Sequence, residues 1–179
     1  AGVPATIVMP TTTPLVKVNN TKDYGAQVIL HGEVFDEAAA LAAQLAEEKG
    51  LTYVHPFNDL GVATGQGTIA YEIFQDLPDV DVILVPIGGG GLAAGVAVKT
   101  PGDLVFPYVQ NNVDHIITIP DTELVDAFLD IMEKHKMVVE NAGLLTVAAL
   151  KRIQGKGLNV VSVLSGGNMD VITMASLVQ

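Results

Sequence analysis

The chain is organised around Val82-Ile83-Leu84-Val85-Pro86-Ile87-Gly88-Gly89-Gly90-Gly91-Leu92. Its first six residues are apolar and rich in β-branched side chains, which is typical of a strand buried on both faces. The backbone N–H groups of a glycine turn at the start of a helix form a concave array that suits a phosphate. A flexible connector is the alternative, but four glycines are more than a connector needs and their conformational entropy opposes folding. The stretch therefore predicts a buried strand followed by a phosphate-binding turn.

The glycine turn does not match the common nucleotide-binding motifs. It lacks the Gly-x-Gly-x-x-Gly spacing with a downstream acidic residue, and it lacks Gly-x-x-x-x-Gly-Lys-Ser/Thr. Dinucleotide and nucleoside-triphosphate sites are therefore disfavoured.

Composition restricts the class of protein. The chain has 179 residues, of which 49% are hydrophobic and only 5% aromatic. This length suits one domain or two small ones. A sequence dominated by Ala, Val, Leu and Gly is typical of an α/β protein with closely packed helices and sheets.

Charge and cysteine content restrict the partners. The formal net charge of −11 argues against a nucleic acid or an anionic membrane surface as partner. Pro86 and the glycines also interrupt the apolar run 82–98, which disfavours a membrane-spanning helix. The absence of cysteine is compatible with a reducing cytoplasm, where we expect the protein to reside. The high apolar fraction predicts a buried subunit interface, hence a homo-oligomer.

Strand and helix patterns alternate along the chain. The expected strands are 6–9, 27–30, 51–54, 81–87, 115–119 and 159–164. The expected helices are 14–24, 36–49, 62–77, 104–111, 123–136 and 141–154, with a short helix after the glycine turn and another at the C-terminus. This alternation predicts a Rossmann-like α/β fold, with parallel strands and helices on both faces. It leaves open whether the strands form one sheet or two.

A second glycine-containing turn, Ser165-Gly166-Gly167-Asn168, follows the last expected strand. If this strand and strand 81–87 are parallel members of one sheet, both turns lie at its carboxyl edge, where open α/β sheets bind ligands. Ser165 supplies a hydroxyl and Asn168 an amide. The two turns together predict a phosphate cradle facing a neutral polar group.

A series of short motifs in a fixed order resembles one enzyme family. The motifs are Ala5–Pro10, Tyr24–Ala26, Leu30–Gly32, His55–Phe57, Gly65–Thr68, Gly88–Leu92, Lys99–Leu104, Val139–Gly143 and Leu164–Asn168. Together they resemble the threonine dehydratase (threonine ammonia-lyase) and serine racemase branch of the fold-type II pyridoxal-phosphate enzymes. The resemblance implies the tryptophan synthase β-like architecture. Residues 1–55 would be a remnant of its small domain, and 56–179 a remnant of its large cofactor-binding domain.

The same resemblance implies a cofactor and the residues that bind it. The cofactor is pyridoxal 5'-phosphate, and its phosphate would be held by Gly88, Gly89, Gly90, Gly91 and Leu92. Ser165 would face the pyridine nitrogen, Glu140 and Phe57 would lie near the ring, and Asn168 would complete the set. A hydroxyl at the pyridine nitrogen does not keep that nitrogen protonated, so the ring is a weaker electron sink. This suits the elimination of water from an amino acid such as threonine.

Two departures from the family bear on activity. The Ser-Phe-Lys-x-Arg-Gly-Ala motif with its Schiff-base lysine and the Ser-x-Gly-Asn-His loop that binds substrate occur nowhere in the 179 residues. In addition, residues 91–95 run directly into 96–99, where family members have a further βαβ unit containing acidic cation ligands. The histidines show no metal-ligand spacing, and we expect no metal site.

These observations lead to two functional hypotheses. By ancestry the chain is a pyridoxal-phosphate-dependent dehydratase that deaminates L-threonine to 2-oxobutanoate, but without the lysine motif we expect it to be inactive. Lys99 is the lysine nearest to the glycine turn in sequence, yet in family terms it lies away from the ring. The alternative is a non-catalytic α/β module that retains at most phosphate or cofactor binding and oligomerisation.

Overall fold

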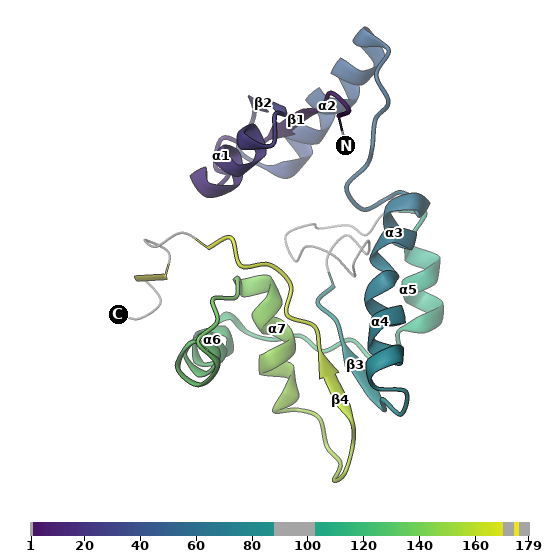
Figure 1. Cartoon of the computed structure of the whole chain (residues 1–179), viewed down its shortest axis with the longest axis vertical. Helices are drawn as coiled ribbons and strands as arrows, with labels where there is room; N and C mark the ends of the chain where they lie inside the picture. The colour runs from purple at the N-terminus through teal and green to yellow at the C-terminus, as the bar shows by residue number, and fades with distance from the viewer. Residues whose placement is uncertain (1, 88–102, 170–173, 176–179) are drawn as a thin grey trace. The chain divides into compact units, whose positions relative to one another are not determined.

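The computed structural model describes residues 2–87, 103–169 and 174–175 (Figure 1). The expected phosphate-binding turn, the helix after it and most of the C-terminal helix lie outside these residues. The described residues form two compact units. The first contains the residues up to Val54 together with those after Gly167, and the second spans His55 to Gly167.

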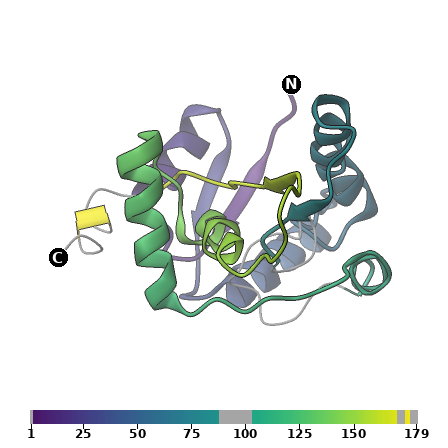
Figure 2. The ribbon, with the colours of Figure 1, turned by 90° about the horizontal axis from the view of Figure 1, so that it is seen from below.

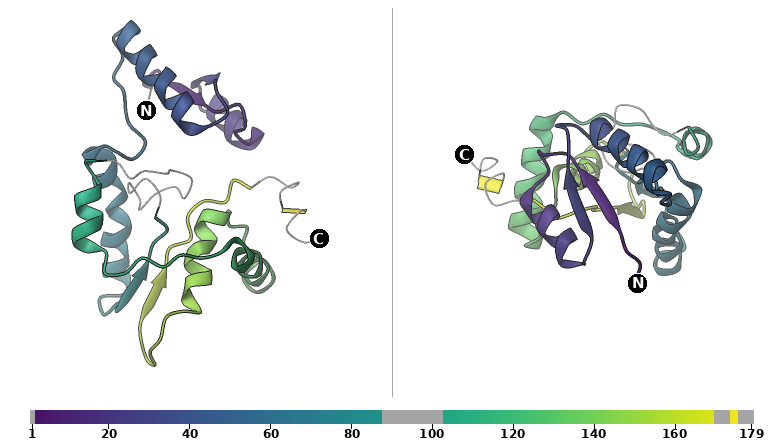
Figure 3. Two further views of the ribbon diagram at one scale, coloured as in Figure 1. Left: turned by 180° about the vertical axis from the view of Figure 1, so that it is seen from behind. Right: turned by 90° about the horizontal axis from the view of Figure 1, so that it is seen from above.

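The first unit is a β-α-β-α arrangement of β1 (Thr6–Met9), α1 (Leu15–Asp23), β2 (Gln27–Leu30) and α2 (Phe35–Lys49). The two strands pair in parallel, with Thr6 opposite Gln27 and Met9 opposite Leu30 (Figure 3). α1 contacts β2 and α2 contacts β1, and each helix contributes one buried residue, Val18 and Ala38 respectively. The sequence predicted all four elements.

The end of α2 explains why the expected strand 51–54 is not formed. Gly50 adopts the left-handed conformation, with φ of 62°. The backbone N–H of Leu51 donates to the carbonyl of Ala46 at 2.8 Å, as in a glycine-terminated helix. That N–H is therefore unavailable to a sheet, and residues 51–54 are assigned to no strand. The prediction of a strand here was wrong.

The second unit contains most of the helices. Its elements are α3 (Leu60–Gln66), α4 (Thr68–Asp76), β3 (Val82–Leu84), α5 (Phe106–Asn112), α6 (Asp121–His135), α7 (Asn141–Leu150) and β4 (Val160–Ser162). β3 and β4 pair in parallel, with Val82 opposite Val160 and Leu84 opposite Ser162. The described strands thus form two separate two-stranded parallel sheets. The α/β class and the parallel pairing are confirmed.

The core of the second unit lies where α6 packs on α7. The two helices cross at a steep angle, since α6 is seen end-on in Figure 1 and lengthwise in Figure 2. α6 buries a face with helical spacing, consisting of Leu124, Ala127, Phe128 and Ile131. On α7, Leu144 and Ala148 are fully buried. This packing holds the elements that surround the candidate site.

Three other expectations about the elements need correction. The single helix expected over 62–77 is divided at Gly67 into α3 and α4. The helix expected over 141–154 ends at Leu150. Residues 115–119 form no strand; Ile116 is 70% exposed, and the carbonyl of Thr118 accepts a hydrogen bond from the Arg152 guanidinium at 2.7 Å. A strand needs hydrogen bonds from a neighbouring strand, and here the Arg152 side chain binds the Thr118 carbonyl instead.

Among the helices in the described part of the chain, none is both long and apolar enough to cross a membrane.

Candidate functional site

The carboxyl ends of β3 and β4 lie side by side, as Figure 1 shows. Beyond the strands proper, the N–H of Val163 still donates to the carbonyl of Leu84 at 3.0 Å. Ser165 follows β4 and residues 85–87 follow β3, so these two segments leave the sheet from the same edge. Gly88, Gly89, Gly90, Gly91 and Leu92 lie outside the described residues, and their part in the site stays a prediction.

The bend at Ser165 lies against Glu140. The N–H of Glu140 donates to the carbonyl of Gly166 at 3.1 Å. Gly166 has a φ of 78°, in the left-handed region that favours glycine. A side chain at this position would also collide with the Glu140 carboxylate. The structure therefore brings together two of the predicted residues, Ser165 and Glu140, and it does so through bare backbone.

Two residues of α7 fix the segment that leads into Ser165. A Cβ at Gly143 would lie 2.9 Å from the backbone nitrogen of Ser165 and closer still to its carbonyl oxygen. The hydroxyl of Thr146, a residue only 3% exposed, lies 3.0 Å from the carbonyl oxygens of both Val163 and Gly143. Sequence reasoning missed the role of Thr146. The available signal was a lone hydroxyl within the apolar run Leu144–Leu150.

Phe57 and Asn168 are held differently. Phe57 is 8% exposed and meets the His55 ring edge-to-face, with the ring centroids 4.5 Å apart. The Nδ1 atom of His55 accepts from the N–H groups of Phe57 at 3.3 Å and Asn58 at 2.9 Å. Asn168 is exposed and groups with the first unit, whereas Phe57, Glu140 and Ser165 belong to the second.

The residues around Ser165 fit a phosphorylated pyridine as far as they are described. Ser165 is half-buried, and its hydroxyl can donate to, or accept from, a ring nitrogen. The backbone at 166 bears no side chain, and the Glu140 carboxylate occupies the space beside it. Neither feature requires a positively charged ring.

The charged groups of the second unit do not include a lysine suited to covalent chemistry, within the residues that the structure describes. Lys134, Lys136, Lys151 and Lys156 are all exposed. Lys134 lies 2.8 Å from Asp130, which raises the pKa of its ammonium. A nucleophilic lysine needs the opposite shift, because only the neutral amine attacks. Over the same described residues, no three His, Asp or Glu side chains cluster as metal ligands would.

Comparisons with known proteins place these features in a family. Residues 1–100 match the family described as pyridoxal-phosphate dependent enzyme. The L-threonine ammonia-lyase of Thermotoga maritima is 42% identical over 217 residues, covering 95% of this chain and 54% of the relative. That of Geobacter sulfurreducens is 39% identical over 226 residues, covering 99% of this chain and 56% of the relative. The chain spans about half the length of these curated relatives.

Solved structures show the same fold. The processed form of threonine deaminase isoform 2 from Solanum lycopersicum matches with a TM-score of 0.86 at 29% identity, covering 97% of this chain and 65% of that one. Maize serine racemase matches with a TM-score of 0.85 at 28% identity, covering 98% of this chain and 69% of that one. The backbone of the chain is thus similar to those of a threonine deaminase and a serine racemase.

The alignments also reveal an internal difference. They extend over 217 and 226 residues, although the chain has only 179. The relatives therefore have residues inside the matched span that have no counterpart here. A missing internal segment is what the direct run from residue 91 to residue 99 predicts.

Proposed function

The chain belongs to the pyridoxal-phosphate-dependent enzyme family, and we propose that it contains the phosphate- and ring-contacting side of a pyridoxal 5'-phosphate site of the threonine ammonia-lyase type. The observation on which this depends is the parallel pairing of β3 with β4, with Leu84 opposite Ser162. It brings the start of the glycine-turn segment and the Ser165 bend to one edge. The relatives named L-threonine ammonia-lyase support threonine as the substrate of the whole protein, with 2-oxobutanoate and ammonia as products.

Each residue of the site has a proposed role. The N–H groups of Gly88–Leu92 bind the phosphate, since a glycine turn offers amides without side chains. The Ser165 hydroxyl contacts the pyridine nitrogen and leaves it unprotonated. Glu140 and Phe57 border the ring, and Asn168 completes the set. The bound cofactor supplies an electron sink that acidifies the substrate Cα–H bond.

We further propose that these 179 residues do not catalyse the reaction by themselves. The sequence has no Ser-Phe-Lys-x-Arg-Gly-Ala motif, and the pKa of Lys134 is raised by Asp130. The chain would bind the cofactor without a covalent link. For the whole protein we propose an amino-acid substrate, a homo-oligomer and a cytoplasmic location, with no nucleic-acid or membrane partner.

Cofactor titration tests the proposal. Pyridoxal 5'-phosphate is added to the chain and its binding is followed by the ³¹P resonance of the phosphate and by the absorbance of the ring. Gly90→Glu should abolish the phosphate shift, because it places a carboxylate in the turn. Ser165→Ala should keep the phosphate shift but change the ring spectrum. Thr122→Val, which removes an exposed hydroxyl on α6, is the matched control and should behave as wild type.

Borohydride reduction separates non-covalent from covalent binding. We expect the intact mass to remain that of the unmodified chain, because no lysine is linked to the cofactor. A lysine adduct found by mass spectrometry would contradict the proposed lack of activity. If wild type binds pyridoxal 5'-phosphate no better than Gly90→Glu does, the non-catalytic module without a cofactor becomes the better description.

A further inference from the structure

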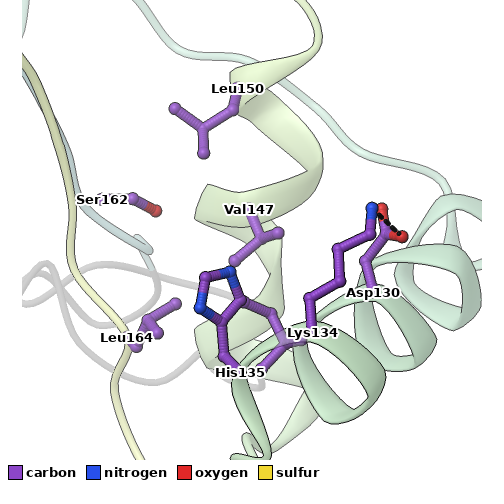
Figure 4. Close-up of a pocket in the computed structure, with 8 residues that line it drawn as sticks. Asp130, Lys134, His135, Val147, Leu150, Ser162 and Leu164 are labelled. Atoms are coloured by element: carbon purple, nitrogen blue, oxygen red, sulfur yellow. Dashed lines mark hydrogen bonds and ion pairs between the residues drawn. The ribbon is translucent and has the colours of Figure 1, made fainter.

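The hollow between α6, α7 and β4, about 240 Å³ in volume, does not gather polar groups that would hold a ligand (Figure 4). The hydroxyl oxygen of Ser162 is shielded from solvent. The Lys134 ammonium is paired with Asp130 at 2.8 Å, and Figure 4 shows this pair directed away from Ser162. The feature of the second unit that lacks a partner lies elsewhere, in the segment that joins α5 to α6.

Residues 113–120 connect α5 to α6 as an extended segment (Figure 2). They contain no helix, turn or bend. Residues 114–118 are all exposed, Ile116 to 70%. A hollow of about 420 Å³ borders residues 113–116 on the side of α5, so no described element covers this part of the segment. The run His115-Ile116-Ile117-Thr118-Ile119 is rich in the β-branched side chains typical of strands.

The backbone of this segment is largely without hydrogen-bond partners. Within the described part of the chain, no N–H group of residues 115–119 donates a hydrogen bond. One carbonyl, that of Thr118, accepts from the Arg152 guanidinium at 2.7 Å. In an extended chain the N–H and C=O groups of successive residues point to opposite edges, so Arg152 occupies only one edge. Three donors and three acceptors remain unpaired on the other edge, those of His115, Ile117 and Ile119.

We propose that two copies of this chain associate by antiparallel pairing of residues 115–119 about a two-fold axis at Ile117. In this register Ile117 faces Ile117 of the second copy and His115 faces Ile119, both as hydrogen-bonded pairs. All the donors and acceptors of the unpaired edge are then used in both copies. A register centred on a neighbouring residue leaves some of these groups unpaired.

The sequence around the segment fits a second copy in this register. On one face, Ile116 of each copy lies beside Thr118 of the other, a cross-strand pair of β-branched side chains. The acidic residue that precedes the segment, Asp114, faces Pro120 of the second copy. Carboxylates are therefore not opposed across the pair, although the chain carries a net charge of −11. Pro120 has no N–H and ends the paired stretch without leaving a donor unpaired.

The pairing is independent of the proposed cofactor site. It uses none of the residues assigned to that site, and it forms whether or not pyridoxal 5'-phosphate binds. A failure of the cofactor titration would leave it unaffected, and a failure of the experiments below would leave the cofactor site unaffected.

Single cysteines test the register, because the chain contains no cysteine of its own. The Cα atoms of a hydrogen-bonded antiparallel pair lie about 5.5 Å apart, within the range that a disulfide spans. Under air oxidation catalysed by copper phenanthroline, Ile117→Cys should therefore give a disulfide-linked dimer on a non-reducing gel. His115→Cys should not, since the two copies of residue 115 are separated by about 14 Å along the strands.

A variant that combines His115→Cys with Ile119→Cys should restore the cross-link, because these two residues face each other across the pair. Equal cross-linking by Ile117→Cys and His115→Cys would indicate random collision between chains and would overturn the proposal.

Proline and threonine at position 117 separate strand pairing from general apolar association. In sedimentation equilibrium, the mean mass of wild type should rise toward that of a dimer as the concentration increases. Ile117→Pro removes the central N–H and should keep the chain monomeric. The fold should tolerate this change, because the segment is already extended and that N–H has no partner in the described structure.

Ile117→Thr is the matched control, since it keeps the N–H and the β-branched shape and removes apolar surface. It should still dimerise. A wild-type chain that stays monomeric at every concentration, or an Ile117→Thr variant as monomeric as Ile117→Pro, would refute the strand pairing.

Discussion

Thr146 is the residue on which the geometry of the Ser165 bend depends most directly. Its hydroxyl lies 3.0 Å from the carbonyl oxygen of Val163, two residues before Ser165, in a position that is 3% exposed. Thr146→Val keeps the shape but removes the hydroxyl, and we expect it to lower the free energy of unfolding by about 1–2 kcal/mol. Urea denaturation measures the change, with Thr122→Val on the exposed face of α6 as control. If Thr146→Val lost no more unfolding free energy than Thr122→Val, the role of the Thr146 hydroxyl at the Ser165 bend would be contradicted.

Gly143 provides a second test at the residue scale. A methyl group there would meet the backbone of Ser165, which cannot move aside as a flexible side chain does. Gly143→Ala should therefore destabilise the chain by about 1–3 kcal/mol and disturb the ring spectrum of bound cofactor.

Gly65 is the matched control, because a Cβ there meets nothing within 4 Å. Gly65 lies in the last turn of α3, and Gly65→Ala should stabilise the chain by about 0.5–1 kcal/mol. Denaturation curves of the two variants measured side by side should shift in opposite directions. Shifts in the same direction would mean that helix propensity, and not the approach to Ser165, decides the effect at Gly143.

The residues of the site differ in how far the sequence could predict them. Ser165 and Glu140 stand in motifs that resemble a known family, and the structure brings them together. Thr146 could not be assigned in this way, because a hydroxyl in an apolar run does not indicate its partner. Its significance comes from the backbone carbonyl of Val163 that the hydroxyl meets, and this depends on packing between elements distant in sequence.

At the scale of elements, the N-terminus of α2 gives a prediction about pH. The carboxylate of Glu37 accepts from the N–H groups of Glu33 and Val34, and these bonds hold the pKa of Glu37 below its ordinary value. A lowered pKa in the folded state stabilises the fold fully above the unfolded value, about 4.3 for glutamate. The contribution is lost as pH falls through the lower folded value.

Glu37→Gln should therefore reduce stability at neutral pH, and the difference from wild type should shrink as the pH falls below about 4. Thermal unfolding measured between neutral pH and pH 3 tests this expectation. Glu47→Gln, an exposed position in the same helix, controls for the loss of one negative charge. A difference from wild type that grows on acidification would mean that the cap is not the source of the effect.

Helices were predicted more accurately than strands, for a physical reason. A helix satisfies its own backbone hydrogen bonds, so the patterns that begin and end α2 and α6 are visible in the sequence itself. A strand depends on a partner that the local sequence does not specify. The strands that have partners, such as β1 and β2, form where they were expected. Residues 51–54 and 115–119 are also mostly apolar, but neither segment forms a strand.

At the scale of the whole molecule, two apolar segments that form no strand, 51–54 and 115–119, leave large apolar side chains exposed. Val54 is 64% exposed and Ile116 is 70% exposed, although each lies in a segment with the composition of a buried strand. The curated relatives are more than twice as long and have residues inside the matched span that this chain lacks. Exposed apolar segments favour association between chains.

The division into two units gives a prediction that involves the whole chain. The described contacts divide between Val54 and His55, and we propose that this boundary separates two domains joined by residues 51–56. Tyr53 is 39% exposed and belongs to no helix or strand. Brief digestion with chymotrypsin should therefore cut first after Tyr53, because a protease needs an extended segment that can enter its cleft. Tyr24 is 92% exposed but lies in the tight turn between α1 and β2, where its N–H donates to the carbonyl of Asn20 at 3.2 Å, and should be cut more slowly. Tyr71 is more exposed, at 65%, but lies within α4 and should resist cleavage.

Tyr53→Thr should delay the first cut. Early cleavage at Tyr71, or a Tyr53→Thr variant cut as fast as wild type between 51 and 56, would show that exposure alone governs the cleavage and that the boundary is not a linker.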